Sequence, residues 1–405
     1  MHRRGRWVHR AAVCPGPGGG TSRVPVAAMC LCGTILLLWG VSAVPTARFA
    51  FRHHIIDAEL PPGAYGQTAA VDIDGCGRPE FITGQQYGTI FWYKFHAPGR
   101  WTRHVLGESS PSDVGACVLD VDGDGRPDFV TGGAWYRNPG DIEEHWEEHI
   151  LAPSAAGETP IFGDLLGDGR PVPVFAMNER FTWFRSQGDK NIEWHATAVT
   201  QQLPEFAQFG HGLGMGDVNG DGRLDLVGTA GWWEAPEDRG RRDWPFHKAD
   251  LGPACANMLV YDVNGDGYND IVTSSAHEYG IWWFEQRIED GVAHFERHEI
   301  DATISQTHAL VLADINSDGV HDFVTGKRYR AHNGHDPGAD EPAVLCWIEL
   351  QRPEPGTCSF TLREVDNNSG VGTQFEVVDL DNDGLLDIIT SNKKGVHAFV
   401  QRRSN

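Results

Sequence analysis

One motif recurs seven times along this chain and constrains its fold more than any other feature. The motif has the form Asp-x-[Asp/Asn]-x-Asp-Gly-x-x-Asp, with strand-like apolar residues on both sides. Internal repeats of about 40 to 50 residues are typical of β-propellers and related arrays, in which each repeat folds as one small sheet. Successive copies are 44 to 65 residues apart and begin at Asp72, Asp120, Asp164, Asp217, Asp262, Asp314 and Asp379.

A second pattern accompanies each Asp motif. An aromatic or apolar residue is followed three positions later by His, and an aromatic segment such as GIWWFE lies between each Asp motif and the next His-bearing segment. Each repeat therefore predicts four short antiparallel strands, the blade of a β-propeller. The copies are Phe51/His54, Trp101/His104, Trp146/His149, Ile192/His195, Trp244/His247 and Phe295/His298, with Arg replacing His in the seventh, Phe360/Arg363.

The phase of the two patterns predicts how the ring closes. The first His-bearing strand, residues 51–56, precedes every Asp motif, and no such strand follows the last motif. We therefore expect 51–56 to complete the last blade, which pairs the two chain ends and leaves no long sheet edge exposed. The predicted fold class is all-β: one seven-bladed β-propeller of four-stranded antiparallel blades over residues 48–405.

Residues 1–47 have the composition of a targeting segment. Residues 1–23 hold five arginines and no acid, and residues 24–44 form an uncharged run of 21 residues. A basic start, an apolar stretch and a small-residue exit indicate a secretory signal peptide, and the run is also long enough for an uncleaved signal anchor. Both alternatives predict export, so the propeller would be secreted, periplasmic or anchored at the outer surface, with membrane contact only through this segment.

The charge balance and the missing motifs exclude several function classes. The chain has 33 basic and 56 acidic residues, a formal charge of −23, whereas nucleic-acid binders need basic surfaces. The chain contains no Gly-x-Ser-x-Gly sequence of a serine hydrolase and no Gly-x-x-x-x-Gly-Lys-[Ser/Thr] phosphate loop.

Two stretches resemble known families. The motifs GDVNGDGRLDLV at 216–227 and YDVNGDGYNDIV at 261–272 resemble the FG-GAP/VCBS repeats of integrin-α-type propellers, and the resemblance extends over about residues 51–401. Residues 304–325 more weakly resemble the propeller domain of aldos-2-ulose dehydratase, with His308 at the matching channel position. The first resemblance implies binding or adhesion, and the second implies elimination chemistry on a sugar. The cupin portion of that dehydratase has no counterpart here, so its isomerase activity is not expected.

Five Asp motifs are complete enough to predict structural calcium sites. Calcium prefers six to eight oxygen ligands, and carboxylates at alternate positions of a tight glycine-containing loop converge on one point. The motifs at Asp72 and Asp164 lack some of these oxygens, so we expect weak or no binding there. The predicted ligands are Asp120, Asp122, Asp124, Asp128, Asp217, Asn219, Asp221, Asp225, Asp262, Asn264, Asp266, Asp270, Asp314, Asn316, Asp318, Asp322, Asp379, Asp381, Asp383 and Asp387.

The turns expected at the mouth of the central channel hold the candidate functional residues. Histidine can act as a general base or bind a metal, Lys or Arg can hold an acidic sugar, and Tyr can protonate a leaving oxygen. We therefore predict a carbohydrate or keto-sugar substrate, a second divalent metal, and proton abstraction followed by elimination, as in a dehydratase or polysaccharide lyase. The predicted catalytic residues are His211, His277, His308, Lys327 and Tyr329, and the predicted substrate-binding residues are Gln85, Asn257, Glu278, Arg328, His335 and Gln374.

Two alternatives remain open on the sequence alone. The propeller can be a non-catalytic binding or cell-surface adhesion module, in which case the predicted catalytic side chains would be scattered around the channel mouth. Cys346 and Cys358 flank a predicted hairpin turn, so they are either a disulfide in an oxidising compartment or two ordinary thiols.

Overall fold

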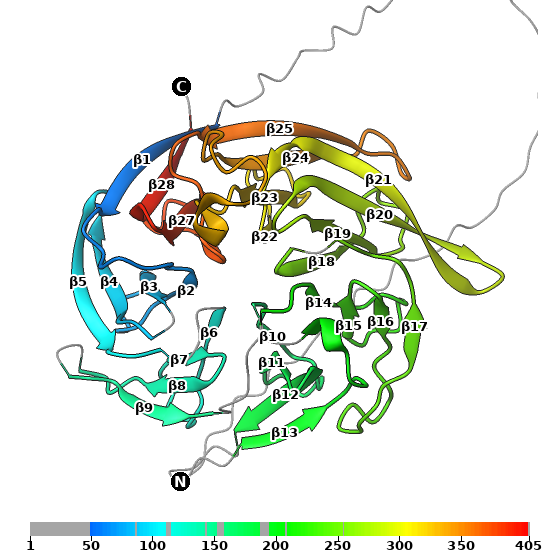
Figure 1. Cartoon of the computed structure of the whole chain (residues 1–405), viewed down its shortest axis with the longest axis horizontal. Helices are drawn as coiled ribbons and strands as arrows, with labels where there is room; N and C mark the ends of the chain where they lie inside the picture. Colours follow the sequence, from blue (N-terminus) through cyan, green and yellow to red (C-terminus); the bar gives the residue numbers. More distant parts are fainter. Residues whose placement is uncertain are drawn as a thin grey trace, which may run out of the picture. The chain divides into compact units, whose positions relative to one another are not determined.

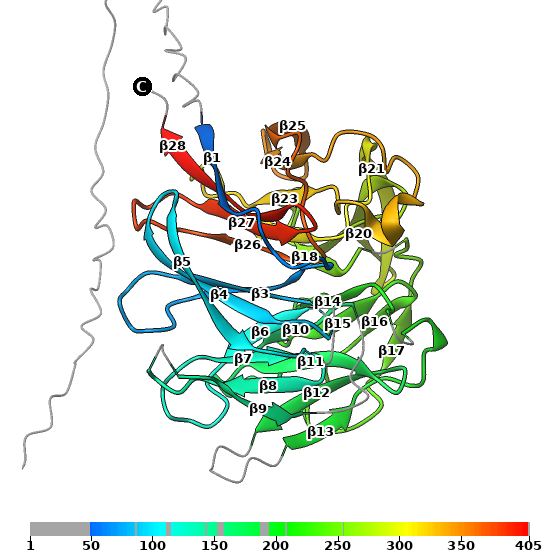
Figure 2. The same cartoon turned by 60° about the vertical axis from the view of Figure 1, so that its left-hand side comes forward.

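The described part of the chain is a ring of β-sheets. The computed structural model describes residues 49–403 except 86, 111–114, 142–143, 152–157, 187–193, 207–208 and 254. The predicted targeting segment 1–47 therefore lies outside the described residues. Within the described residues, the strands form small twisted sheets arranged around an axis, as Figures 1 and 2 show. No helix in this part of the chain is long and apolar enough to cross a membrane.

Five sheets of the described part are separate antiparallel blades of four strands each. The inner strand of each blade consists of the residues that directly precede an Asp motif. The predicted all-β propeller is therefore confirmed. The blades are β2 (Gln67–Val71) to β5, with β3 (Glu80–Gly84), β4 (Ile90–Ala97) and β5 (Arg100–Gly107); β6 (Ala116–Leu119), β7 (Asp128–Thr131), β8 (Ala134–Arg137) and β9 (Glu147–Ile150); β10 (Ile161–Gly163), β11 (Val172–Met177), β12 (Arg180–Ser186) and β13 (Trp194–Ala198); β22 (Leu310–Ala313), β23 (Asp322–Gly326), β24 (Leu345–Gln351) and β25 (Ser359–Asp366); and β26 (Phe375–Val378), β27 (Asp387–Asn392), β28 (Gly395–Arg403) and β1 (Phe49–Asp57).

The expected number of seven separate blades is wrong, because the remaining eight strands form one continuous sheet. In that sheet β14 pairs in parallel with β18 through Leu213 and Gly214. Glycine permits this approach, since a Cβ atom on Gly214 would lie 2.4 Å from the Met258 carbonyl oxygen, and one on Gly216 would lie 2.4 Å from Val260 Cβ. The strands are β14 (Leu213–Gly216), β15 (Asp225–Gly228), β16 (Gly231–Trp233), β17 (Phe246–Lys248), β18 (Asn257–Tyr261), β19 (Asp270–Ser274), β20 (Tyr279–Glu289) and β21 (Val292–Ser305).

The two ends of the described chain close the ring, as predicted. β1 pairs antiparallel with β28 from Phe49 opposite Arg403 to Asp57 opposite Val396, and the two strands lie side by side in Figure 2. The histidine of the repeat in this blade is His53, not His54 as predicted, because His53 is the residue that lies opposite Phe399 and stacks on its ring at 4.5 Å.

The same stacking explains the His-bearing strands of other blades. The imidazole of the fourth strand lies over the Trp of the third strand, with ring centroids 4.1 to 4.6 Å apart. Such offset contacts between aromatic faces add to the energy of apolar burial. The pairs are Trp92/His104, Trp135/His149, Trp232/His247 and Trp283/His298. Ile192 of the predicted pattern lies outside the described residues.

Five of the Asp motifs are closed by their last acid, whereas the motif at Asp164 ends in Val172. Asp128 is fully buried, and its two carboxylate oxygens accept backbone N–H groups from Val121, at 2.9 Å, and from Asn138, at 2.8 Å. The final acid of the motifs that begin at Asp217, Asp262, Asp314 and Asp379 makes the same pair of bonds. Burial raises the pKa of Asp128 to about 7. The motif thus ties the start of the Asp loop to the third strand of its blade.

The same loops also connect neighbouring blades. The carbonyl of the second motif residue accepts a hydrogen bond from a side chain that lies in, or directly after, the third strand of the next repeat. Examples are Asn138 Nδ2 to the Ile73 carbonyl at 3.1 Å and Gln401 Nε2 to the Ile315 carbonyl at 2.8 Å. Ser186, Gln286 and Arg352 make the corresponding bonds between other blades.

Cys346 and Cys358, for which the sequence allows a disulfide, are free thiols. A turn does connect β24 and β25, but Cys346 lies opposite Glu364 in this hairpin, while Cys358 precedes Ser359, the partner of Gln351. The two residues are therefore separated along the hairpin by most of its length, and the disulfide alternative does not apply.

Glu376 is an acid of the inner strand β26 that generates a testable pH dependence. Burial raises its pKa from 4.5 to about 7, although the Thr68 hydroxyl donates a hydrogen bond to Glu376 Oε1 at 2.6 Å. An acid with a higher pKa in the folded state contributes most to stability below pH 4.5, and this contribution is lost as the pH rises to 7.

We expect Glu376→Gln, which imitates the protonated acid, to lose less stability than the wild type between pH 4.5 and 7. The difference should be on the order of 2 kcal/mol, measured by urea unfolding at the two pH values. Glu364→Gln, on the exposed face of β25, is the control. An equal loss of unfolding free energy in the wild type and in Glu376→Gln between these two pH values would contradict the prediction.

Candidate functional site

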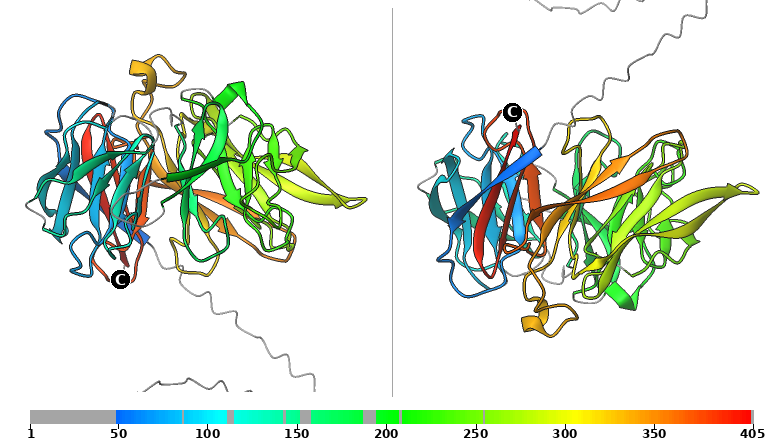
Figure 3. Two further views of the ribbon diagram at one scale, coloured as in Figure 1. Left: turned by 90° about the horizontal axis from the view of Figure 1, so that it is seen from below. Right: turned by 90° about the horizontal axis from the view of Figure 1, so that it is seen from above.

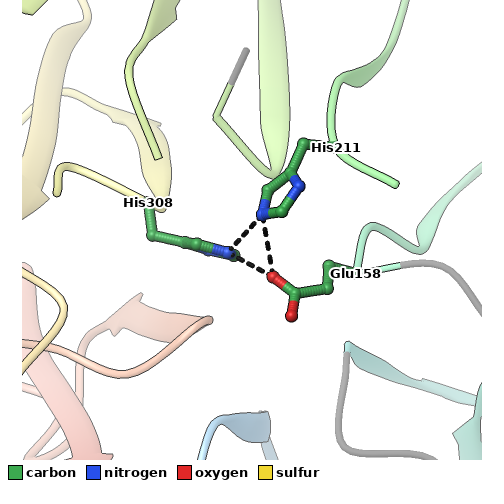
Figure 4. A group of neighbouring side chains, drawn as sticks. All are labelled: Glu158, His211 and His308. Atoms are coloured by element: carbon green, nitrogen blue, oxygen red, sulfur yellow. Dashed lines mark hydrogen bonds and ion pairs between the residues drawn. The ribbon is translucent and has the colours of Figure 1, made fainter. Parts of the chain in front are cut away.

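Three side chains from different blades converge near the axis of the ring. Glu158 precedes β10, His211 precedes β14 and His308 precedes β22. Each residue stands just before an inner strand, the position at which the sequence predicts channel-mouth residues. Figure 4 shows the three side chains pointing toward one another, with the ends of several strands around them.

The three polar atoms lie within hydrogen-bond distance of one another. Glu158 Oε2 is 2.6 Å from His308 Nε2 and 2.9 Å from His211 Nε2, and the two imidazole nitrogens are 3.0 Å apart. The side chains of Glu158 and His308 are 7% and 0% exposed, whereas that of His211 is 19% exposed. The cluster is thus buried on one side and reachable through His211.

Arg328, which follows β23, adds a positive charge. Its Nη1 lies 3.3 Å from Glu158 Oε2. Burial alone would raise the pKa of Glu158, but hydrogen bonds from His211 and His308 and the charge of Arg328 outweigh it, so its pKa lies well below the usual range. Burial and Arg328 lower the pKa of His308 to about 3, so its imidazole is neutral at pH 7.

The donor set fits a divalent transition metal. Two imidazole nitrogens and one carboxylate are the ligands that Zn²⁺ uses in catalytic sites with an open fourth position. The two rings are inclined at 71°, so their Nε2 atoms meet at one place. Tetrahedral zinc would hold such atoms about 3.3 Å apart, so the three distances would need to increase by about 0.3 to 0.7 Å. Glu158, His211 and His308 would hold the ion.

A second cluster beside this one has a different geometry. His277 Nδ1 lies 3.0 Å from Asp336 Oδ2, and His332 Nδ1 lies 2.9 Å from Asp336 Oδ1. The two rings are stacked at 22° and 4.4 Å. Their Nδ1 atoms contact the two different oxygens of one carboxylate, so Asp336 holds both rings in place. His277 also lies edge-on to His211, with ring centroids 4.9 Å apart.

Asp336 and His332 come from the long insert between β23 and β24. The insert contains the short 3-10 turn η2 (Ala331–Gly334) and projects from one face of the ring in Figure 3. Arg330 and His332 adopt left-handed backbone conformations, with φ of 50° and 44°. Non-glycine residues held in this region are often found at binding sites.

Two residues predicted for the site have other contacts. Lys327 is 3% exposed, and its ammonium donates to the carbonyl oxygens of Gly338 and Glu341, so it anchors the insert. Gln374 bridges the inner strands, since its Oε1 accepts from Ala116 N at 2.8 Å and its Nε2 donates to the Ala116 carbonyl at 3.0 Å. The structure does not bring either side chain to the histidines.

The remaining predicted residues have contacts other than the cluster of Glu158, His211 and His308. Tyr329 lies under the Lys394 ammonium, 4.5 Å from its ring centroid, and lines a small cavity with Arg328. Gln85 donates to the Tyr65 hydroxyl at 3.2 Å. Asn257 pairs with β14, whereas Glu278 and His335 are exposed.

The sequence analysis did not assign a role to Glu158, His332 or Asp336. Glu158 lies just before an inner strand, as His211 and His308 do, so its position was available as a signal. The roles of His332 and Asp336 depend on how the insert folds back toward His277, which no repeat pattern encodes.

The five predicted calcium loops form tight turns around their first acid. In the loop at 120–128, Asp120 accepts backbone N–H groups from Gly123 and Gly125, at 2.8 and 3.0 Å. Ligand atoms of Asp120, Asp122 and Asp128 lie within 4.8 Å of one another. The loop geometry is therefore compatible with a cation bound by oxygen atoms.

Basic side chains distinguish these loops. Arg137 Nε lies 2.6 Å from Asp122 Oδ2, and Arg402 lies 2.9 Å from Asp381 Oδ2. Arg223 pairs with Asp221 in the same way. Among the described residues, no Lys or Arg is paired with the carboxylates of the loops at 262–270 and 314–322. The Arg352 guanidinium nevertheless lies against the first of these loops, because it donates to the Asp262 and Val263 carbonyls.

Comparison with known proteins agrees with the repeat architecture. A family model described as an FG-GAP-like repeat matches residues 72–131 and 262–325, and one described as an FG-GAP repeat matches residues 209–239. No curated protein matches the chain.

Several solved structures have a similar fold at low sequence identity. An exotype rhamnogalacturonan lyase, YesX, is 13% identical with a TM-score of 0.50, covering 87% of this chain and 76% of its own. BBS1N in complex with ARL6DN is 8% identical with a TM-score of 0.51, covering 88% and 98%. A lectin from Agrocybe aegerita that recognises non-reducing terminal N-acetylglucosamine is 15% identical with a TM-score of 0.47, covering 75% and 81%.

At these identities the similar structures show the fold alone. The assignment of the family rests on the repeats themselves, because the matched segments are the Asp motifs that open the sheets of this ring. This chain belongs to the FG-GAP-repeat family of β-propellers.

Proposed function

We propose that this protein is an exported, calcium-stabilised β-propeller that binds a carbohydrate at a metal site in the mouth of its channel and processes it by proton abstraction and elimination. The observation that carries the proposal is the convergence of Glu158 Oε2, His211 Nε2 and His308 Nε2 within 3.0 Å of one another. A divalent ion bound there would stabilise the negative charge that develops on a substrate oxygen. The lyase of similar fold is a precedent for elimination chemistry on this scaffold.

His277 is the residue best placed to accept the proton. Asp336 engages its Nδ1, which leaves Nε2 for proton transfer, and burial lowers the pKa of His277, so the ring is neutral at pH 7. The base would take the proton next to a carbonyl or carboxylate carbon. The C–O bond on the adjacent carbon would then break, and the oxygen would leave as water or an alcohol after taking a proton from solvent.

The metal site is tested by titrating the purified protein with Zn²⁺ in excess Ca²⁺, which occupies oxygen-only sites. We expect Glu158→Gln and His211→Gln to weaken zinc binding at least about tenfold, since even outer-shell partners of a metal contribute that much. The measurement is isothermal titration calorimetry, with the absorption of bound Co²⁺ as a second readout.

His247→Gln is the matched control, because His247 stacks on Trp232 in an outer strand and contacts Glu234 rather than the cluster. Zinc affinity that is equal in wild type and Glu158→Gln would overturn the metal assignment.

The reaction is tested by incubating the purified protein with uronate polymers and keto-sugars while recording ultraviolet absorbance from an unsaturated product. We expect His277→Gln to lower the rate by about 10² or more, the usual contribution of a general base. His294→Gln, on the far end of the β20–β21 hairpin, should have the wild-type rate. Absence of product with every substrate, with metal supplied, would favour a non-catalytic binding or adhesion module.

The calcium sites are proposed from the loops and their different surroundings. Asp318 is contacted by the Asn316 amide at 2.9 Å, whereas Asp124 pairs with Arg126. A fixed guanidinium compensates part of the loop charge and would compete with an ion. We therefore propose that the loop at 314–322 binds calcium most tightly.

We expect chelation of calcium to lower the melting temperature by several degrees, because a ligand that binds only the folded state stabilises it. Asp318→Asn should remove a larger part of the calcium-dependent increase in melting temperature than Asp124→Asn does. Differential scanning calorimetry with Ca²⁺ and with chelator measures both effects. A melting temperature that does not respond to the chelator would contradict calcium stabilisation.

A further inference from the structure

A small cavity lies beside the cluster of Glu158, His211 and His308, which we call the metal cluster. The cavity is lined by basic groups and by an unpaired hydroxyl. It measures about 30 Å³, and its walls include Tyr65, Arg328, His332, Thr373 and Lys393. No Asp or Glu is among the described residues that line it. This local surplus of positive charge stands out in a chain with a formal charge of −23, and it makes the cavity attractive to anions.

Thr373 connects the cavity to the metal cluster. Its carbonyl oxygen lies 3.3 Å from His308 Nδ1. Thr373 is 6% exposed, and its buried Oγ1 atom has no hydrogen-bond partner among the described residues. An unsatisfied buried hydroxyl costs free energy unless a ligand or water completes its hydrogen bonding.

The charges around the cavity are only partly neutralised. Arg328 is paired with Glu158, but Lys393 forms no ion pair among the described residues, and its ammonium donates to the Arg330 carbonyl at 2.8 Å. Partial burial and the charges of Arg328 and Arg330 lower the pKa of Lys393. An anion bound here would relieve this repulsion between cations.

A larger cavity adjoins the small one. It measures about 550 Å³ and shares Ala64, Tyr65, Asn392 and Lys393 with the small cavity. Cavities of a few hundred Å³ hold ligands of the size of one or two sugar rings, whereas about 30 Å³ admits only a small substituent of a few atoms.

We propose that the small cavity between Arg328, Thr373 and Lys393 binds the anionic substituent of a saccharide whose rings occupy the larger cavity. The ligand is therefore an acidic saccharide, with a carboxylate or a sulfate ester as the recognised group. This inference rests on the proposed carbohydrate-binding function and specifies its substrate class. Arg328 belongs to both sites, so it would place the anionic group beside the metal cluster.

The test compares ligands that differ only in charge. Calorimetry with the purified protein at low ionic strength measures binding of trigalacturonate, of its neutral methyl ester and of a sulfated galactose oligosaccharide. We expect trigalacturonate or the sulfated sugar to bind at least about tenfold more tightly than the ester, and this preference to shrink as salt is added. The stronger of the two acidic ligands identifies the recognised group.

Variants of the cavity separate this inference from the metal site. We expect Lys393→Gln and Thr373→Val to weaken the acidic ligand about tenfold and a few-fold, without changing the affinity for the ester or for Zn²⁺. Lys248→Gln, on the exposed strand β17, is the matched control. Glu158→Gln should lose zinc but keep the preference for the acidic ligand.

Equal affinity for acid and ester, or binding of neither acidic ligand, would overturn the inference. If no zinc binding is measured but the protein still prefers the acidic ligand over the ester, the metal-dependent function is contradicted. The inference about the anion-binding cavity is then supported.

Discussion

The buried acid that ends five of the Asp motifs makes the interaction on which the ring depends. A carboxylate removed from water is costly unless its oxygens accept hydrogen bonds. Asp128 meets this requirement only when the loop closes onto it and the third strand lies alongside. The carbonyl of the same loop then accepts a side chain of the next blade, as Ile315 does from Gln401. One buried group thus fixes the fold of a blade and the position of its neighbour.

The opposite ends of the inner strands carry the candidate site. Glu158, His211 and His308 lie just before β10, β14 and β22, and their side chains meet near the axis. The ring holds these side chains close together, and such an arrangement would favour the proposed metal binding because a metal site must be organised before an ion arrives. The glycines of β14 bring two blades closer together on the side that carries His211.

The two proposed classes of metal site differ in chemistry and in purpose. The Asp loops offer only oxygen, which suits calcium, and lie where the blades need reinforcement. The axial cluster offers imidazole nitrogen beside a single carboxylate, which suits a transition metal. The basic groups of Arg328 and Lys393 line the cavity beside the axial cluster of Glu158, His211 and His308. An anionic ligand would therefore be attracted to this end of the ring, although the chain as a whole is acidic.

The sequence by itself determined the repeat, the four-stranded unit and the closure through β1, because these follow from local periodicity and from the phase of the motifs. It also indicated His211, His277 and His308, since they depart from the repeat. Tertiary structure decided that eight strands merge into one sheet, because this depends on a close approach at Gly214 that no pattern announces. It also decided that Glu158 joins the histidines, since residues 150 positions apart in the chain meet only when the ring closes.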